Sequence, residues 1–479
     1  MHANPRANSA GRHPDALLPA EPTQRRIARE LYEQVAGLPI VSPHGHVPPE
    51  LLAENRPFNN PAELFITPDH YVTRLLHAHG VPLADLGVGA EALSDAQARQ
   101  SWRILCEKWA LFAGTPMKYW LEDVLLNVFE VEEVPSAANA ELLFDHIDER
   151  LRDRAYLPRA LVESFHIETL ATTDDPLSEL EHHAALRDDA SFGTDVIPTL
   201  RIEGFIDPAQ PKWQANVTAL LDRTGGDDTV ESYLTAIADR RRHFAEHGAV
   251  SIDCALVDAR TAVLPTARLA ELYASARRSA LTPAEADEFR AGMLGELARQ
   301  SQEDGLVLTL HVGALRNYDG PVHRRFGPDR GADIPLTTPF AEGLRPLLNE
   351  FGHDPAFHLV LFTLDETAWA REIAPLAGFY PSVYAGAPWW FLDEPEAILR
   401  YRSAVTGAIG FGKQSGFIDD TRALCSIPSR HDMARRLDAA FLSKLVSEHR
   451  LSADEAASII RQITYELPRA TFRLAHFGH

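Results

Sequence analysis

The sequence predicts an α/β protein, a (β/α)8 barrel in which a helical insertion follows the first strand. Three observations lead to this fold class. Eight short apolar runs alternate with segments of helical periodicity, as buried parallel strands alternate with crossover helices. About 120 residues separate the first run from the second, far more than one crossover helix needs. Polar side chains follow several runs, at the strand ends where barrels carry their sites.

The eight expected strands are β-branched or otherwise apolar, and polar residues follow them. They are 38–46, 166–174, 196–201, 249–256, 306–313, 357–364, 382–388 and 408–420. The last run is rich in glycine, so its strand limits are the least defined. Eight strands are the number that closes a barrel of this class.

Helical periodicity fills the long gap and the end of the chain. Apolar residues recur at helical spacing in three stripes: Trp102, Leu105, Trp109 and Phe112; Leu143, Ile147 and Leu151; and Met433, Leu437, Phe441 and Leu445. A capping box of Ser452 and Glu455 opens a final helix that carries Ile459, Ile460 and Ile463. We expect these apolar side chains to lie in the core.

These elements divide the chain into five parts. A polar tail and a first helix occupy residues 1–30, and residues 31–50 contain the first barrel strand. The helical insertion spans 51–160, the remainder of the barrel 161–430, and the C-terminal helices 431–479.

Composition excludes several classes of protein. The chain has 479 residues, of which 45% are hydrophobic, the balance of a globular protein. Its 46 basic and 68 acidic residues give a net charge of −22, which repels nucleic acid and anionic membranes. No apolar run is long enough for a membrane span. Three scattered cysteines, Cys106, Cys254 and Cys425, suit a reducing compartment, so we expect a cytoplasmic protein.

His44-Gly45-His46 ends the first expected strand and is the most informative local motif. Residues i and i+2 of a strand point to the same face, so both imidazoles can reach one metal ion in a barrel mouth. Among 21 histidines an HxH pair is by itself a weak signal, and two satisfied or solvated loop histidines are the alternative.

His311 and Asp420 strengthen the metal hypothesis because they lie at the ends of the fifth and eighth expected strands. Together with His44 and His46 they offer nitrogen and oxygen ligands for one divalent metal such as zinc. Three alternatives stay open: a buried His311 bonded to a backbone carbonyl, Asp420 as a helix N-cap, and Asp419 as the ligand in its place.

Asp69-His70-Tyr71 follows the first strand and can supply acid–base groups to a sugar hydroxyl or carbonyl. Such a triplet is more often a helix start capped by its aspartate. No phosphate-binding GxxxxGK[ST] loop, early GxGxxG, GxSxG or HExxH motif is present in the sequence.

Two arginines and a tryptophan pair complete the candidate residues. Arg201 ends the third run and Arg422 follows the last, and both suit bidentate binding of a carboxylate. An acidic protein needs such groups to hold an anionic substrate, although a structural ion pair is the alternative. Trp389-Trp390 follows the seventh run and can line a pocket or pack in the core.

With these motifs in place, the sequence resembles the uronate isomerase (glucuronate isomerase) family of the amidohydrolase superfamily. The matching stretches run in the family's order from about Val41 to the C-terminal helix: PHGHVPPELLAEN, PDHYVTRLLHAHGV, ESFHIETLATTDDP, VIPTLR, LHVGALRN, FGPDRGAD, APWWF and FIDDTR. So many ordered blocks are far more specific than any one of them. The resemblance implies a distorted (β/α)8 barrel of the metal-dependent hydrolase type, with an active-site loop in the insertion.

The resemblance also implies a reaction, the aldose–ketose isomerisation of D-glucuronate to D-fructuronate and of D-galacturonate to D-tagaturonate, at the entry of hexuronate breakdown. The small uronate substrate is the expected partner. Carried over position by position, the resemblance places the family's metal ligands at His44, His46 and Asp420 and its strand-five histidine at His311. It places the residues of the active-site loop at His70 and Tyr71. The substrate-binding groups fall on Arg422, Arg201, Trp389 and Trp390.

Moving the carbonyl from C1 to C2 requires a base, an acid and an electrophile for the enediolate. We expect Asp420 and Tyr71 to exchange the protons, while His70 and Arg422 position the substrate. One divalent metal, with zinc expected, would serve as the electrophile or orient the hydroxyls, and whether it is essential stays open. His311 counts both as a candidate metal ligand and as a substrate contact.

Four departures from the family pattern leave these acid–base groups intact and leave the preferred epimer open. They are Gly45 for a cysteine, Val72-Thr73 for Lys-Trp, Ile202-Glu203 for Pro-Asp, and Asp365-Glu366 for Asn-Pro.

Two rival functions are compatible with the motifs. The first is a metal-dependent hydrolase of amides, esters or lactones, although the run 249–256 lacks the lysine that often bridges two metals, which favours one metal at most. The second is a catalytically silent binding protein; polar groups at so many strand ends argue against it, because burying them is unfavourable without a role. A homo-oligomer is expected only because enzymes of this kind commonly form one.

Overall fold

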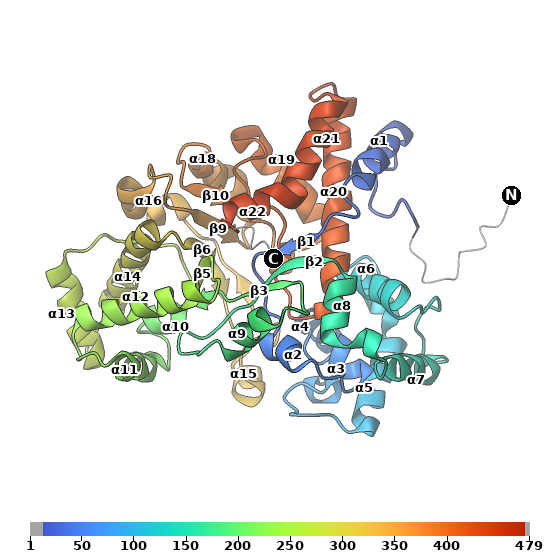
Figure 1. The fold of residues 1–479 in the computed structure, drawn as a ribbon, viewed down its shortest axis with the longest axis horizontal. Coiled ribbons are helices and arrows are strands. Elements are labelled where there is room, and N and C mark those ends of the chain that lie inside the picture. Colours follow the sequence, from blue (N-terminus) through green and yellow to red (C-terminus); the bar gives the residue numbers. More distant parts are fainter. Residues whose placement is uncertain (1–12, 475–479) are drawn as a thin grey trace.

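The computed structural model describes residues 13–474, which form an α/β fold (Figure 1). The described strands make two parallel sheets and one small antiparallel pair. One parallel sheet has the order β1-β2-β3 and the other the order β10-β9-β6-β5-β4. Residues 1–12 of the expected tail lie outside the described residues, and the first helix is α1 (Pro22–Glu33).

Seven of the eight predicted runs contain an observed strand. The sheets are built from β1 (Ile40–Ser42), β2 (Ile167–Ala171), β3 (Asp195–Ile197), β4 (Leu200–Arg201), β5 (Ser251–Leu256), β6 (Val307–Val312), β9 (Leu359–Thr363) and β10 (Val383–Ala385). The antiparallel pair, which the sequence did not predict, consists of β7 (Ala314–Leu315) and β8 (Ile334–Pro335).

The third predicted strand is divided in two. Its first half, β3, pairs with β2, and its second half, β4, pairs with β5. Pro198 lies between the halves, and because proline lacks a backbone N–H it interrupts the ladder. An isolated parallel bridge between Asp174 and Leu200 joins the two sheets edge to edge.

The prediction of a regular eighth strand over 408–420 is wrong. Helix α19 (Pro395–Ile409) extends into this run, and within residues 13–474 only Gln414 forms a bridge here, to Ala385 of β10. Gly410 and Gly416 have φ angles of 60° and 74°, which a regular strand does not contain. The segment therefore continues the series of strands as an irregular connection rather than as a ladder.

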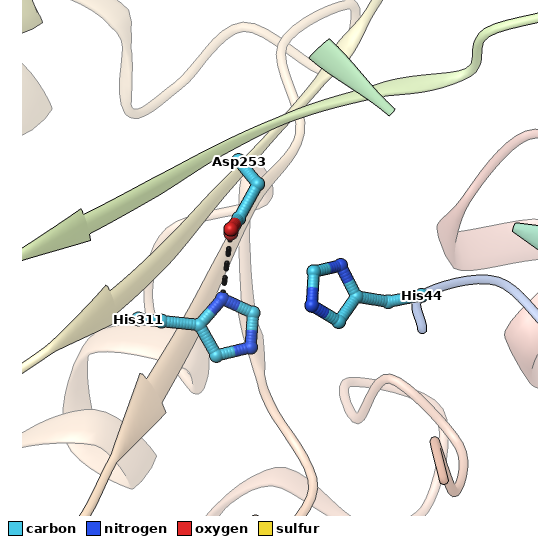
Figure 2. A group of neighbouring side chains, drawn as sticks. All are labelled: His44, Asp253 and His311. Carbon is cyan, nitrogen blue, oxygen red and sulfur yellow. Dashed lines mark hydrogen bonds and ion pairs between the residues drawn. The ribbon is translucent and has the colours of Figure 1, made fainter. Parts of the chain in front are cut away.

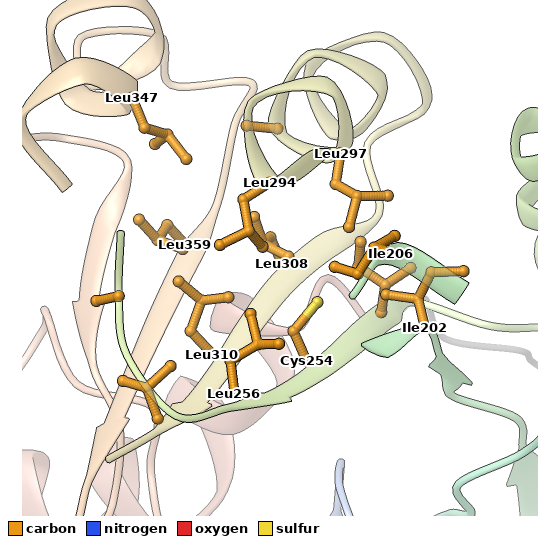
Figure 3. Packing of buried hydrophobic residues seen from close by; sticks show 14 of the residues in the cluster. Ile202, Ile206, Cys254, Leu256, Leu294, Leu297, Leu308, Leu310, Leu347 and Leu359 are labelled. Atoms are coloured by element: carbon orange, nitrogen blue, oxygen red, sulfur yellow. The ribbon is translucent and has the colours of Figure 1, made fainter. Parts of the chain in front are cut away.

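Alternation along β5 and β6 separates the core from the site. Cys254 and Leu310 point to the outer side, where they pack with leucines of α14 (Pro283–Asp304) and α16 (Phe340–Phe351) (Figure 3). Neighbouring side chains of a strand point to opposite faces. Asp253, next to Cys254, and His311, next to Leu310, therefore lie on the inner side.

The chain between β1 and β2 carries seven α-helices in the described residues, and the predicted Trp102 and Leu143 stripes are buried there. These helices lie together on one side of the sheets in Figure 1. They are α2 (Pro49–Glu54), α3 (Pro61–Phe65), α4 (His70–Ala78), α5 (Asp95–Glu107), α6 (Pro116–Asp123), α7 (Ala140–Arg150) and α8 (Pro158–Ser164).

Further helices connect the later strands. Besides α14, α16 and α19 these are α9 (Glu181–Asp188), α10 (Glu203–Ile206), α11 (Trp213–Thr224), α12 (Val230–Glu246), α13 (Thr266–Arg277), α15 (Gly320–Phe326), α17 (Glu366–Ala368) and α18 (Ala374–Ala377). Within residues 13–474, none of the helices combines the length and apolar character that a membrane span requires.

The C-terminal helices pack on the N-terminal one. They are α20 (Ile427–Ser447), α21 (Ala453–Arg461) and α22 (Leu467–Thr471). The predicted capping box of Ser452 and Glu455 is present at the start of α21. Ala28 and Leu31 of α1 share a buried cluster with Leu442 of α20 and Ile460 of α21, so the two ends of the chain form one core.

The last described residues close the amino ends of the strands. Tyr465 donates a 2.5 Å hydrogen bond to Glu168 of β2, and the His358 ring, just before β9, lies 2.9 Å from the Thr471 carbonyl oxygen. Arg473 donates to the carbonyl oxygen of Gly305, just before β6, at 2.9 Å. The end of the chain therefore ties down the side of the sheets opposite the predicted site.

Candidate active site

One pocket at the carboxyl ends of the parallel strands collects every residue that the sequence predicts for the site. Its empty space, part of which is open to solvent, is about 680 Å³. The predicted residues that line it are His44, His46, His70, Tyr71, Arg201, His311, Trp389, Trp390, Asp420 and Arg422. They are joined there by Asp69, Asp253, Ala255, Arg316, Asp329, Gly331, Asp333 and Thr421.

His44 and His46 lie just beyond β1, in an irregular segment rather than in the strand itself. The backbone N–H of His46 donates to the Thr421 carbonyl oxygen at 2.9 Å, which ties this segment to the turn that carries Asp420. Oδ1 of Asp420 is 2.9 Å from Nε2 of His46 and 3.4 Å from Nε2 of His44. Three groups from opposite ends of the sequence thus meet at one point.

These three residues fit a divalent metal ion. Among the described residues, the buried Oδ1 of Asp420 has no hydrogen-bond partner, although both imidazoles point toward it. Burial alone would raise the pKa of Asp420, but the facing imidazoles hold it well below the usual range, so the carboxylate stays ionised. Burial lowers the pKa of His46, which favours the neutral, ligating form. Two imidazole nitrogens and a carboxylate oxygen form a common ligand set.

His311 belongs to a second, neighbouring group with His44 and Asp253 (Figure 2). Its Nδ1 is 2.6 Å from Oδ1 of Asp253, which also accepts a 2.8 Å hydrogen bond from Thr309. The ring of His311 stacks on that of His44 with centroids 4.6 Å apart. His311 therefore bonds to a carboxylate rather than to a backbone carbonyl, and its buried Nε2 has no partner in the described chain.

Asp69, His70 and Tyr71 are both a helix start and part of the pocket. The Asp69 carboxylate caps α4 by accepting a 2.8 Å hydrogen bond from the Tyr71 N–H. This cap places the His70 and Tyr71 rings with their centroids 4.4 Å and 4.5 Å from that of Trp390. The helix-start alternative and the catalytic one are thus compatible in this structure.

Burial changes the proton affinity of both rings. Burial, together with the nearby Arg422 charge, lowers the pKa of His70 to about 3, so its imidazole is neutral near pH 7. Burial raises the pKa of Tyr71 well above its usual range, so the phenol keeps its proton. The pocket therefore presents a neutral imidazole and a protonated phenol.

Each pocket arginine has a nearby acidic residue. Arg201 Nε lies 2.5 Å from Glu203 Oε1, so the glutamate that replaces the family's aspartate reaches its partner. Arg422 Nη2 is 3.4 Å from Asp329 Oδ2. Burial would raise the pKa of Asp329, but Arg422, Arg201 and other nearby charges lower it to about 2. The arginines are thus held in place by acidic partners beside the pocket.

Backbone strain coincides with two of the site residues. Asp420 has a φ of 44° and Trp390 a φ of 51°, both in the left-handed region that side chains other than glycine seldom adopt. Such conformations cost about 1–3 kcal/mol each and cluster at functional sites. The fold thus holds one candidate ligand and one aromatic wall residue in unfavourable conformations.

Several acidic and basic groups of the pocket were not predicted from the sequence. Asp253 was detectable as a carboxylate within the otherwise apolar run 249–256. Arg316 and Asp333, with Nη1 and Oδ2 3.5 Å apart, lie in the connection between β7 and β8, where no regular pattern marks a functional residue.

The structure also distinguishes Asp419 from Asp420. Asp419 does not line the pocket: its Oδ2 lies 3.1 Å from Nε2 of His431 on α20. Asp420 is not an N-cap, because the next helical turn begins at Leu424. Between the two aspartates, only Asp420 is placed to act with His44 and His46.

Known proteins resemble this chain along nearly its whole length. A family model described as glucuronate isomerase matches residues 22–472. A uronate isomerase of Cutibacterium acnes is 46% identical over 461 residues, which cover 96% of this chain and 98% of the relative.

Solved structures give the same result. The crystal structure of a glucuronate isomerase from Caulobacter crescentus is similar with a TM-score of 0.96 and 42% identity, over 98% of each chain. A uronate isomerase structure from Thermotoga maritima has a TM-score of 0.89 and 31% identity, over 96% of this chain and 99% of that one.

Proposed function

Because the chain belongs to the glucuronate isomerase family, it is an enzyme of uronate isomerisation, and we propose that it interconverts D-glucuronate with D-fructuronate and D-galacturonate with D-tagaturonate. The observation that carries the proposal is one pocket in which Asp420, Tyr71 and Arg422 surround the same space. A carboxylate, a phenol and a guanidinium are the groups that a carbonyl shift on an anionic sugar needs.

The reaction transfers a proton from C2 of the open-chain aldose to C1 of the ketose. In our proposal, the Asp420 carboxylate accepts the C2 proton, for which its depressed pKa keeps it ionised. Tyr71, which keeps its proton, donates it to O1, which becomes a hydroxyl, and regains one from the C2 hydroxyl, which becomes the carbonyl. The protonated Asp420 then returns its proton to C1. The neutral His70 and the Arg422 charge hold the oxygens on which the enediolate charge develops.

The substrate carboxylate requires a cationic subsite. Arg201 and Arg422 both line the pocket with side chains 29% and 28% exposed, so they can be reached by a ligand. We propose that Arg201 binds the C6 carboxylate, with Trp389 and Trp390 forming the apolar wall beside the sugar.

One divalent metal, which we propose to be zinc, would be held by His44, His46 and Asp420. When bound it supplies a Lewis acid that polarises the carbonyl or orients the hydroxyls of the sugar. His311 contributes a further unpartnered nitrogen beside this set, as either a ligand or a substrate contact.

We further propose that the strands form a distorted (β/α)8 barrel whose eighth member is the irregular segment around Gln414. The parallel bridge to β10 and the hydrogen bond from His46 to Thr421 support closure on both sides of this segment. In this proposal residues 51–160 form an insertion that covers one side of the barrel mouth, 161–430 complete the barrel, and the enzyme acts in the cytoplasm.

Proton NMR in D₂O tests the function directly. The zinc-loaded protein is incubated with D-glucuronate and, separately, with D-galacturonate. We expect signals of the ketouronate to appear, deuterium to enter at C2 when the aldose re-forms, and the two initial rates to rank the epimers. Unchanged spectra with folded, metal-loaded protein would contradict the proposal and favour the hydrolase alternative. A second sample, treated with chelator, shows whether the metal is essential for turnover.

A further inference from the structure

Arg430 of α20 is a charged residue in the interior of the molecule, and no step proposed above uses it. Its side chain is 0% exposed, and that of its ion-pair partner Asp393 is 2% exposed. Nη1 of Arg430 lies 2.6 Å from Oδ2 of Asp393. A charge buried so completely strongly disfavours folding unless its contacts compensate, so its contacts are informative.

These contacts reach two parts of the pocket wall. The guanidinium carbon of Arg430 lies 4.7 Å from the ring centroid of Tyr71 and 3.6 Å from that of Trp120. Its partner Asp393 donates its backbone N–H to the carbonyl oxygen of Trp390 at 3.1 Å, which closes the turn with the left-handed residue. Arg430 thus contacts the catalytic phenol directly and the aromatic wall through Asp393.

A third contact reaches the proposed metal ligand from behind. Nη1 of Arg430 donates to the Asp419 carbonyl oxygen at 3.5 Å, one residue before Asp420. His431, next to Arg430 on α20, lies 3.1 Å from the Asp419 carboxylate. The start of α20 therefore supports the turn in which Asp420 has its unusual φ.

A second buried ion pair on the same helix gives a matched comparison. Arg402 of α19 binds Asp438 of α20 through two contacts of 2.6 Å and 2.8 Å, and their side chains are 6% and 3% exposed. Neither residue lines the pocket. This pair has the bidentate geometry expected of an ion pair that serves stability.

The Arg430 pair lacks that geometry. It has one direct contact, and in the described chain Nη2 of Arg430 and Oδ1 of Asp393 are buried without a hydrogen-bond partner. Stability alone does not favour this arrangement, because unpartnered buried polar atoms are destabilising. A guanidinium placed over two aromatic rings instead fixes their positions.

We propose that Arg430 is a positioning residue of the isomerase site, which holds Tyr71, the Trp390 turn and the Asp419–Asp420 turn in one fixed arrangement. The inference rests on the proposed function, since it assigns Arg430 a role through Tyr71 and Asp420. The charge of Arg430 also opposes the effect of burial on the pKa of Tyr71, although burial still holds that pKa above its usual range.

The test compares Arg430→Lys with Arg402→Lys in the full-length, zinc-loaded enzyme. Lysine keeps the charge in both variants but cannot place a planar guanidinium over two rings. We expect Arg430→Lys to lower kcat per folded protein by about 10- to 100-fold, because misplaced proton-transfer groups slow the chemical step, with KM within about twofold. For Arg402→Lys we expect a lower unfolding midpoint with kcat and KM unchanged.

Equal kcat values for wild type and Arg430→Lys, or a rise in KM in place of the loss of kcat, would overturn the inference. If Arg430→Lys does not fold, Asp393→Asn replaces it and Asp438→Asn becomes its control. We expect a lower kcat for Asp393→Asn and not for Asp438→Asn. An unchanged kcat in Asp393→Asn would also overturn the inference. Turnover by the wild-type enzyme tests the proposed function separately, since the inference concerns only the ratio between variants.

Discussion

The two ends of the parallel strands differ in how well their polar groups are satisfied. At the carboxyl ends, Asp420 and His311 each have a buried atom without a hydrogen-bond partner among residues 13–474, and Asp420 is also in a strained conformation. At the amino ends, Glu168, His358 and Arg473 have partners contributed by the chain's last helical turns or by nearby carbonyl groups.

This difference separates function from stability within one set of strands. Unsatisfied buried groups are unfavourable for folding, so their concentration in one pocket points to a role in binding or catalysis. Satisfied groups at the opposite end serve the fold. We therefore expect matched substitutions at the two ends to have opposite effects: loss of activity at the carboxyl ends and loss of stability at the amino ends.

The largest expected effect is that of Asp420→Asn. Asparagine is isosteric and tolerates the left-handed conformation, so the turn should remain, but the base and the charge are lost. We expect kcat to fall by about 10³-fold or more, because the proton acceptor is lost with them, while the unfolding midpoint in urea stays the same or rises.

The matched control for Asp420→Asn is Glu168→Gln at the amino ends, which should keep full activity and lower the free energy of unfolding. Near-normal turnover by Asp420→Asn would exclude Asp420 as the base.

A smaller effect is expected for Arg422→Lys. Lysine retains the charge but loses the planar fork that binds a carboxylate or a developing oxyanion in two places. We expect kcat/KM for the uronate to fall by about 10- to 100-fold, as for the loss of a charged hydrogen bond. Arg473→Lys at the amino ends is the control, and steady-state kinetics of both variants should differ; equal kinetics would remove the role given to Arg422.

His70 links the site to the pH dependence of stability. Its pKa is about 3 in the folded protein and 6.5 in the reference state, so the unfolded chain binds more protons between these values. Stability is therefore lost as pH falls from 6.5 toward 3, with a slope from this group of up to about 1.4 kcal/mol per pH unit.

His70→Asn should remove this slope, measured as urea unfolding midpoints between pH 7 and pH 5. The same acid destabilisation in wild type and variant would mean that His70 is not the responsible group.

The smallest effect is expected for Tyr465→Phe. It deletes one partly buried hydrogen bond to Glu168, so the free energy of unfolding should fall by about 1 kcal/mol while kcat and KM stay unchanged. A loss of activity in this variant would contradict the separation between the two strand ends.

The sequence predicted most of the architecture and the residues of the pocket, for physical reasons. Runs such as 306–313 are recognisable because buried parallel strands must be apolar, and the HxH motif because two imidazoles at i and i+2 converge. The irregular segment 408–420 was not recognisable, because its glycines disrupt the ladder without changing its apolar composition.

Asp253 and Arg430 show why some residues around the site could not be predicted from the sequence. Asp253 stands in a buried strand and Arg430 in a helix, and their importance depends on His311 and Tyr71, which are distant in sequence. Contacts of that kind follow from the tertiary fold and not from local pattern.

The packing of α1 on α20 and α21 has a consequence for the synthesis of the protein on the ribosome. The apolar face of α1, with Ala28 and Leu31, is synthesised before the residues of α20 and α21 that cover it, among them Leu442 and Ile460. Until those residues are made this face lacks these native partners, and contacts between such distant residues form slowly. The nascent chain therefore exposes an apolar helix face during this interval, and such exposed surfaces are prone to aggregation.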